Sequence, residues 1–458
     1  MNKTLWEEVL KFNFDDPNDE YGFSTRLSLE NHWTLYFTQN ALLEYKKFMF
    51  LAATNNEMVS PSETVDIVWH QHLIFTNSYS DLCNLLGKRI EHIPSTHNRL
   101  EFEKFQKAKE RTSALYESVF GAQPQEIWHY KNELDSLYLD ESKFEILNLR
   151  KMFLWYSIFL SVPVCLIIFP VLIKIPNPNF LLFYILAFGA AILFLEFYVS
   201  KSFISLYEKI KSNSILANLT PLELVFLKEN KLEAVVHGVV NNLIENKKIK
   251  ILTNRRLQLI DENLVDNPYE NCVIEIMKEF DPMTYRFLCT SAMQKPIFEQ
   301  LKKGTSRIRE IIMDSKQFIF IIILSMIVLG FLLSIVFSRL ITGIYRDKPI
   351  VFLLIAIVAL VFASFYYLDR VINLLFTKII PLSFKEEVRK NKENSKNWEW
   401  NYFLYGNMVL ASSFIPLTNY NSNTFSSNNS NSSGSCSSSC GSSCGSSCGS
   451  SCGGCGGD

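Results

Sequence analysis

The sequence predicts a mainly α-helical membrane protein: a helical N-terminal soluble domain, four transmembrane helices in two hairpins, a small winged-helix-like α+β insert and a disordered tail. Three observations support this fold class. Four long stretches carry almost no charge, several polar regions have apolar residues three and four positions apart, and the end of the chain consists largely of Asn, Ser, Gly and Cys. We therefore expect six consecutive parts, namely residues 1–145, 152–199, 200–316, 318–368, 369–418 and 419–458.

Four stretches are long and apolar enough to cross a lipid bilayer, which takes about 20 residues of helix. A buried helix of a soluble protein usually keeps a polar face, and these stretches have none. The acid within them, Glu196, lies within one turn of a span end, so we expect it to reach headgroup water rather than to line an ion path. The stretches are residues 152–173, 180–199, 318–337 and 350–368.

Lysine and arginine near the span ends predict the orientation. They are more frequent beside the N-terminal region, the region between the hairpins and the segment after the last span. By the positive-inside rule these parts, and both termini, face the cytosol in a multi-pass protein of the cell membrane. The segment SRLITGIYRDKP at 338–349 is more basic than the rule expects. The N-terminus lacks the pattern of a secretory signal, and the net charge of −1 gives no general attraction to nucleic acid or acidic substrates.

Residues 1–145 have the pattern of amphipathic helices. In LENHWTLYFTQNALLEYKKFMFLAAT, apolar residues recur at intervals of three and four, as expected for a helix with one buried face. A second helix is expected to begin near Pro61 and Ser62, because this pair followed by acidic residues is typical of a helix N-terminus. Gly87 is expected to end the helix that contains Cys83.

Several motifs in this region carry a family resemblance. ENHWT, EYKKF, PSETVDIVWHQHL, IEHIPST and FGAQPQEIW, over residues 25 to 130 or so, resemble the N-terminal region of bacterial glycine-rich-domain-containing proteins. A related domain occurs in eukaryotic glycine-rich-domain proteins, and VDxVWHxHL is the most specific motif. The family has no established biochemical role, so the resemblance implies a domain type without an activity.

Carboxylate, imidazole and thiol groups suited to metal binding gather in the same region. On a helix, Asp66 and His70 share a face, whereas His70 and His72 point about 200° apart and cannot readily hold one ion. In a structural interpretation, Asp66 holds the His70 ring and His72 contacts the next segment, so His70→Ala should destabilise the region more than His72→Ala. In a functional one, the cluster binds metal or performs acid/base chemistry. The candidate ligands are Asp66, His70, His72, Cys83 and His92.

The insert between the hairpins begins with a helix start at Thr220, Pro221 and Glu223. A second amphipathic helix follows at 231–245, and IKILTNRRLQLI predicts a short hairpin around Asn254 and Arg255. Two helices and a basic hairpin outline a winged helix. Nearby glutamates and the flanking spans disfavour nucleic-acid binding, so a protein partner on the cytosolic side is preferred. The basic residues are Lys247, Lys248, Lys250, Arg255 and Arg256.

The tail cannot bury enough apolar area to fold. Thiols four residues apart on a flexible backbone suit soft ions such as Zn²⁺ or Cu⁺, and they also suit acylation beside a membrane or oxidative crosslinking. A repeat without a ligand is the remaining alternative. Together with the paired spans and the insert, this tail resembles an uncharacterised class of bacterial membrane proteins. The cysteines are Cys436, Cys440, Cys444, Cys448, Cys452 and Cys455.

The leading interpretation is a membrane-anchored binding or scaffold protein with cytosolic domains and a thiol-rich tail. One alternative is a metal-dependent or acid/base enzyme that uses Asp66, His70, Cys83 and His92. The other is a membrane-bound regulator that acts through the winged-helix-like insert. No sequence feature assigns a particular reaction.

Overall fold

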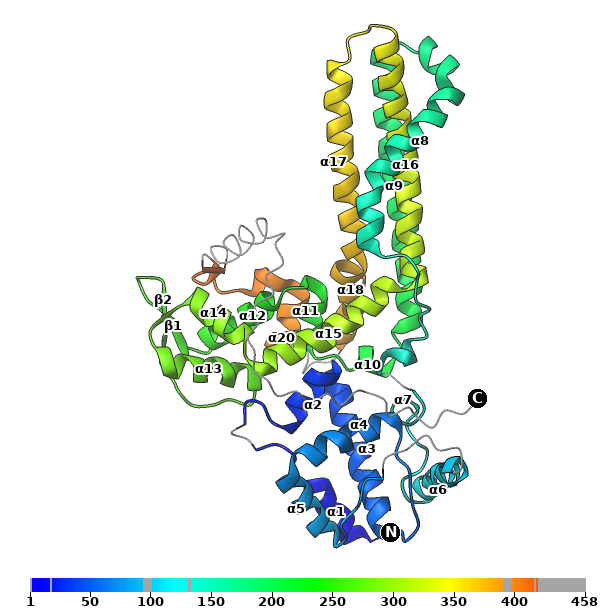
Figure 1. Cartoon of the computed structure of the whole chain (residues 1–458). Helices are drawn as coiled ribbons and strands as arrows, with labels where there is room; N and C mark the ends of the chain where they lie inside the picture. The colour runs from blue at the N-terminus through cyan, green and yellow to red at the C-terminus, as the bar shows by residue number, and fades with distance from the viewer. Residues whose placement is uncertain are drawn as a thin grey trace, which may run out of the picture.

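The computed structural model of the chain describes residues 2–16, 19–93, 101–130, 133–390, 397–415 and 417–418. It is mostly helical, with three short strands. Long apolar helices form a bundle at one end of the molecule, and the polar regions lie together at the other end (Figure 1). The mainly α fold class is therefore confirmed.

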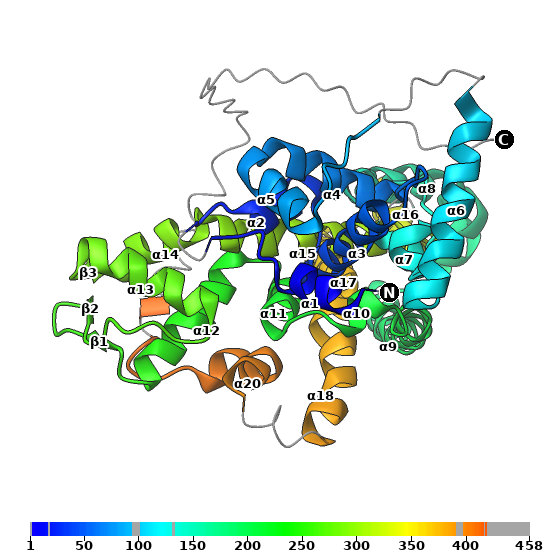
Figure 2. The same ribbon diagram turned by 90° about the horizontal axis from the view of Figure 1, so that it is seen from below.

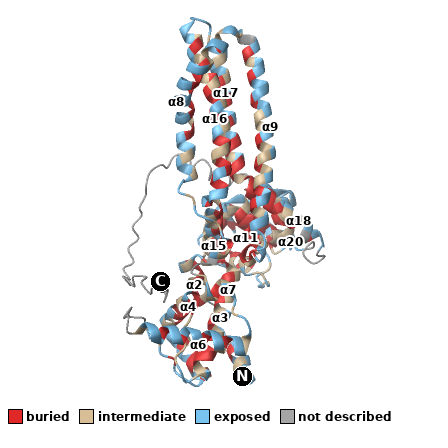
Figure 3. Ribbon diagram, turned by 90° about the vertical axis from the view of Figure 1, so that its right-hand side faces the viewer, coloured by how far each residue is buried: buried red, intermediate tan, exposed pale blue. Residues whose placement is uncertain are grey.

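The bundle contains four helices of membrane-spanning length and composition, as the sequence predicts. α16 packs against the other three, and 56% of its most apolar stretch is buried, against 22–28% for the others. Much of the surface of α8 and α9 stays exposed, as lipid-facing helices require (Figure 3). The helices are α8 (Ile146–Lys174), α9 (Asn177–Ile210), α16 (Lys316–Tyr345) and α17 (Val351–Leu374).

Arginines of α16 and the following turn bind the end of α8, where the last carbonyl groups lack partners within the helix. Arg339 is buried, donates to the carbonyl oxygens of Leu172 and of Ile175, the latter at 2.7 Å, and lies over the ring of Phe180. Arg346 donates to the carbonyl oxygen of Ile173 at 2.9 Å. The basic character of SRLITGIYRDKP thus has a structural use, because cations are favourable at a helix C-terminus.

Two ion pairs connect the other end of the bundle. Arg150 of α8 pairs with Asp369 of α17 at 2.9 Å, and Arg370 of α17 pairs with Glu196 of α9 at 2.7 Å. Glu196 was expected to reach headgroup water. Its Oε1 instead contacts an arginine, and its Oε2 is buried without a hydrogen-bond partner within the described part of the chain. The acid therefore joins two helices.

The N-terminal region packs around α3, whose Tyr45 and Phe48 are fully buried. A buried carboxylate ties this helix to later ones, because Glu44 accepts from Lys47, from Tyr116 of α6 and from Trp128 of α7 at 2.7–2.8 Å. The helices are α1 (Lys3–Lys11), α2 (Phe23–Asn31), α3 (Leu35–Thr54), α4 (Glu63–Ile74), α5 (Thr76–Leu86), α6 (Phe102–Phe120) and α7 (Gln125–Trp128), followed by the 3₁₀ turn η2 (Glu133–Leu137).

The insert confirms the predicted local features. Thr220 and Glu223 form a capping box, and the expected hairpin pairs Ile249 with Leu259 and Ile251 with Leu257. A third strand extends the antiparallel sheet in the order β1-β2-β3; the winged-helix assignment stays a prediction. The elements are α10 (Ser214–Ala217), α11 (Pro221–Glu229), α12 (Leu232–Glu245), β1 (Ile249–Ile251), β2 (Arg256–Leu259), α13 (Pro268–Phe280), β3 (Met283–Thr284), α14 (Tyr285–Met293) and α15 (Pro296–Asp314).

The segment after the last span returns to the insert. Tyr402 donates to the carbonyl oxygen of Ala234 at 2.8 Å, and Asn241 accepts from the backbone of Ala411 at 2.7 Å. The insert and this segment therefore share one packed unit. The elements of the segment after the last span are the π turn η3 (Leu375–Ile379), α18 (Ile380–Lys390), α20 (Trp398–Tyr405) and the 3₁₀ turn η4 (Gly406–Val409).

Buried Arg309 of α15 connects the insert to the bundle. Its guanidinium donates to the carbonyl oxygen of Leu227 at the end of α11 at 2.7 Å and to the side chain of Asn373 in α17 at 2.6 Å. It also lies 4.1 Å from the ring centre of Phe376. Burial lowers the pKa of Arg309 to about 10, so the group stays charged at neutral pH.

The N-terminal region docks on the same helix. In Figure 2, which views the molecule from the end opposite the bundle, α2 and α3 lie over α15, and the sheet lies at the far edge of the insert. A Cβ on Gly304 of α15 would lie 2.7 Å from the carbonyl oxygen of Trp33 and 3.2 Å from Cα of Thr34. The close approach of two backbones therefore requires glycine here.

Replacing Gly304 by alanine should separate these two regions. The methyl group meets backbone that cannot rotate away, so we expect a loss of about 1–3 kcal/mol, seen as a lower melting temperature and faster proteolysis around residue 34. Gly189→Ala in α9 is the matched control, because its Cβ would meet no atom within 4 Å. Equal melting temperatures for the two variants would contradict the docking contact.

Candidate functional site

Helix α4 places two of the candidate ligands on one face. Ser62 caps the helix by accepting from the backbone of Val65 at 3.2 Å, and this fixes where the turns begin. Asp66 and His70 then lie one turn apart, as the sequence predicts. Their side chains are 25% and 45% exposed.

The segment after α5 brings His92 to the same place. Gly87 ends α5 with a φ of 69°, a left-handed conformation that favours glycine. Lys88 donates to the carbonyl oxygens of Ala52 and Asn55 at 3.1 and 2.8 Å. These bonds draw the chain back towards the end of α3, so that it continues beside α4.

A second set of contacts holds the His92 ring itself. Tyr79 donates to the carbonyl oxygen of Ile90 and accepts from the indole of Trp69 at 3.2 Å. The Trp69 ring meets the His92 ring edge to face, with centres 4.6 Å apart. The position of His92 is therefore fixed by packing and not by the candidate ligands alone.

Three ligand atoms converge at this point. Nε2 of His92 lies 3.0 Å from Oδ1 of Asp66 and 3.0 Å from Nε2 of His70, and Nε2 of His70 lies 3.5 Å from Oδ2 of Asp66. A neutral imidazole has one N–H, so a single proton on His92 cannot satisfy both neighbours with straight hydrogen bonds. A cation between the three atoms would satisfy all of them.

His72 does not belong to this group. Its surroundings indicate that His72→Ala, and not His70→Ala as the sequence predicted, is the more destabilising substitution. His72 is fully buried among aromatic rings, and its two ring nitrogens meet Tyr45 at 2.9 Å and Ser78 at 3.0 Å. The predicted contact with the next segment is thus present, through Ser78. Burial lowers the pKa of His72 to about 4. His72, and not the exposed His70, is the histidine that the fold depends on.

Cys83 also lies apart from the three converging atoms. It is buried on α5 and borders a cavity of about 620 Å³ that His92 borders as well. The grouping of possible metal ligands around His92 contains Asp66 and His70 but not this thiol. The tail cysteines Cys436, Cys440, Cys444, Cys448, Cys452 and Cys455 lie outside the described residues.

A second group of possible metal ligands, which was not predicted from the sequence, lies in the insert and consists of Glu233, His237 and Cys289. A signal was present, because Glu233 and His237 are four residues apart on a predicted helix and therefore share one face. The third member comes from α14, more than fifty residues away in the chain. Nothing in the sequence pairs these two helices.

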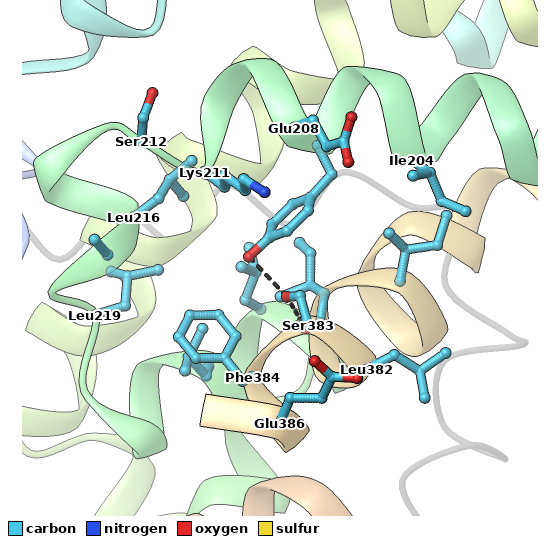
Figure 4. A pocket seen from close by; sticks show the side chains of 16 residues that line it. Ile204, Glu208, Lys211, Ser212, Leu216, Leu219, Leu382, Ser383, Phe384 and Glu386 are labelled. Carbon is cyan, nitrogen blue, oxygen red and sulfur yellow. Dashed lines mark hydrogen bonds between the residues drawn. The ribbon is translucent and has the colours of Figure 1, made fainter. Parts of the chain in front are cut away.

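A third feature is a cavity of about 640 Å³ between the polar end of α9 and α18. Figure 4 shows Leu216, Leu219 and Phe384 on its apolar wall and Glu208, Lys211 and Glu386 around it. Tyr207 shares a hydrogen bond of 2.7 Å with Ser383 across it. This wall lacks the convergence of ligand atoms seen at His92.

Comparison with known proteins finds partial similarity to two plant proteins. Over 91 residues the chain is 33% identical to glycine-rich domain-containing protein 1 and 32% identical to glycine-rich domain-containing protein 2, both of Arabidopsis thaliana. The aligned part is 19% of this chain and 11–12% of the relatives, so the chain matches about a tenth of their length. No family model and no solved structure matches.

These matches support the resemblance to glycine-rich domain-containing proteins over part of the chain. They are with plant proteins, and they do not extend to the bacterial relatives or to the class of membrane proteins that the sequence suggests. Those two assignments stay predictions. The names of the two plant proteins describe a domain composition and no reaction.

Substitution of the two neighbouring histidines distinguishes their roles. His72→Ala removes a fully buried ring and leaves the Tyr45 hydroxyl without its partner, so we expect a loss of about 3 kcal/mol in unfolding free energy. His70→Ala should change it by less than about 0.5 kcal/mol, because its side chain is nearly half exposed and lies at the surface. Thermal and denaturant unfolding of the metal-free full chain measures both, and a larger loss for His70→Ala would restore the sequence-based interpretation.

Proposed function

We propose that this chain is a membrane-anchored binding protein whose N-terminal region binds a divalent transition metal through Asp66, His70 and His92. The observation that carries the proposal is the convergence of one carboxylate and two imidazole Nε2 atoms within 3.0–3.5 Å. Two nitrogens and one oxygen form a ligand set that zinc accepts, as does ferrous iron.

The spacing suits a metal without large movement. Zn–N and Zn–O bonds of about 2.1 Å in a tetrahedron separate the ligand atoms by about 3.4 Å. The distances between the three side chains lie on either side of that value. The ring of Trp69 and the bond from Tyr79 to Ile90 keep His92 in place, and such support keeps a metal ligand correctly oriented.

The exposure of the site favours binding over catalysis. Three protein ligands leave at least one coordination position open, and His70 is 45% exposed on its side chain, so a partner group or a water molecule can fill that position. A metal-bound water would also supply the nucleophile of a hydrolytic enzyme, which is the alternative function. Such an enzyme needs an enclosed substrate site, whereas the His70 side of this position is nearly half exposed.

The site is far from the apolar bundle, because α4 lies at the opposite end of the molecule (Figure 1). With the bundle in a bilayer, the metal would face an aqueous compartment, which the positive-inside rule assigns to the cytosol. The function that fits is the presentation of an exchangeable metal site to a soluble protein partner. The tail thiols, as a proposed second group of soft-metal ligands, would be in the same compartment.

Zinc should bind to the full chain and stabilise it. A ligand that binds only the folded state at a hundred times its Kd adds about 2.7 kcal/mol of stability, so zinc should raise the melting temperature and a chelator should reverse the effect. The six tail cysteines are replaced by serine in the parent protein, so that they do not bind the added metal. Calorimetric titration and melting curves measure the Kd and the shift.

Matched variants locate the site. Asp66→Asn and His92→Gln should each weaken zinc binding at least tenfold or so, since loss of even a supporting contact costs about 10–100-fold. His129→Gln is the control, because this histidine is exposed and has no role in the cluster. Unchanged zinc affinity in both site variants would exclude the proposed site, and a bound metal that accelerates ester or phosphoester hydrolysis would favour the enzyme alternative.

A further inference from the structure

The insert contains a buried cluster of three side chains that commonly bind metals. Glu233 and His237 lie one turn apart on α12, and Cys289 comes from α14. One ligand atom of each lies within 4.8 Å of the other two, and Nε2 of His237 is 3.8 Å from Oε1 of Glu233. His237 is 6% exposed and Cys289 is fully buried.

The fold brings these helices together for reasons independent of the cluster. Thr284 caps α14 directly after β3, and β3 is held in place by pairing with β2. The buried faces of α12 and α14 then pack against each other. Cys289 and Tyr285, one turn apart on α14, consequently face α12.

Tyr285 orients the imidazole. Its hydroxyl shares a hydrogen bond with Nδ1 of His237, and the Tyr285 side chain is itself buried, which holds the hydroxyl beside that nitrogen. When Nδ1–H donates to this oxygen, the lone pair of Nε2 is directed to the side where Glu233 lies. A metal-ligating histidine usually donates a hydrogen bond from the ring nitrogen that does not bind the metal, as Nδ1 of His237 would do here.

We propose that Glu233, His237 and Cys289 bind a second divalent metal ion, with zinc best matched to the ligand set. Zinc accepts thiolate at about 2.3 Å and imidazole or carboxylate at about 2.1 Å. In a tetrahedron such bonds place the ligand atoms about 3.4–3.6 Å apart, so the observed separations need only small side-chain rotations. Metal binding replaces the thiol proton of Cys289, which is released to solvent.

The fourth coordination position has a route to solvent. Glu233 and His237 line a cavity of about 300 Å³ whose other wall includes Tyr402 and Phe403 of α20. The cavity can supply a water molecule as the fourth ligand. Because α20 belongs to the segment that follows the last span, that segment would cover the open side of the metal site.

Cobalt distinguishes this site from the one near α4. Co²⁺ occupies zinc sites, and a cobalt–thiolate bond gives an intense charge-transfer absorption that nitrogen and oxygen ligands do not give. Asp66, His70 and His92 offer no sulfur, so in the full chain with its six tail cysteines changed to serine the band reports on the remaining cysteines. We expect the band to correspond to one thiolate-bound cobalt ion per chain, and we expect the thiol proton to be released as it forms.

Two cysteine variants provide the test. Cys289→Ser should abolish the band, whereas Cys272→Ser on the neighbouring helix α13 should retain it. His92→Gln should retain it as well, so failure of the first site and failure of this one are separable. Absence of the band in the parent protein, or its persistence in Cys289→Ser, would overturn the proposal.

A variant that keeps the Cys289 thiol tests the site even if Cys289→Ser fails to fold. Glu233→Gln preserves shape and removes one anionic ligand, so the band should remain while the cobalt Kd rises at least tenfold or so. Circular dichroism of the metal-free proteins establishes that each variant is folded before cobalt is added. An unchanged Kd in folded Glu233→Gln would show that the carboxylate is not a ligand and that the three-residue site is wrong.

Discussion

The structure depends on one buried charge, the guanidinium of Arg309. Burial of a cation is costly unless its donors are paired, and here the carbonyl oxygen of Leu227 and the side chain of Asn373 accept from it while the Phe376 ring covers it. These three partners belong to α11, α17 and the turn η3. An arginine in α15 can therefore reach this environment only if the insert is docked against the polar end of the bundle.

The same helix α15 connects the remaining parts of the chain. Its C-terminal end leads directly into α16, the most buried helix of the bundle. Gly304 of α15 packs closely against the backbone of Trp33 and Thr34 from the N-terminal region. Buried Glu223 of the capping box extends this contact, because its Oε1 accepts a hydrogen bond from the backbone N–H of Leu35 at 3.4 Å. Movement of the insert relative to the bundle would thus disturb the N-terminal region too.

The parts of this architecture that could be predicted from sequence are those decided by neighbours in the chain. The four apolar helices follow from length and hydropathy, and the starts of α4 and α11 follow from Ser62 and Thr220 with the acids after them. The roles of long side chains could not be predicted, because Arg309 and Arg339 meet backbone carbonyls from distant segments. From charge alone, the segment at 338–349 was more basic than the positive-inside rule expects. The structure gives the reason, because Arg339 and Arg346 bind carbonyl oxygens at the end of α8.

The candidate site shows the same division. Helical spacing correctly joined Asp66 to His70 and separated His72 from them, but it could not tell which histidine faces the core. That depends on Phe14 from the segment after α1, Phe23 of α2 and Tyr45 of α3, which enclose His72. The position of His92 depends on Gly87 and on the bonds of Lys88 and Tyr79. The helix end at Gly87 was predicted from the sequence and is confirmed, but the bonds of Lys88 and Tyr79 to distant backbone carbonyls follow from neither the motif nor the spacing of ligands.

The two ligand clusters differ in the property that determines what a bound metal can do. Each has a carboxylate and a histidine four residues apart on one helix and a third ligand from another segment. Near α4 the third ligand is an imidazole and the site is open to solvent, which favours exchange of the metal and of its outer ligand. In the insert the third ligand is a buried thiol on α14, which favours retention. The insert is fixed to the bundle through Arg309, so a metal retained at the proposed insert site would stabilise the part that supports the N-terminal region, while a metal at the proposed site near α4 would be exposed to solvent. Burial, and not ligand spacing, distinguishes the two proposed sites, because the spacing along the helix is the same in both.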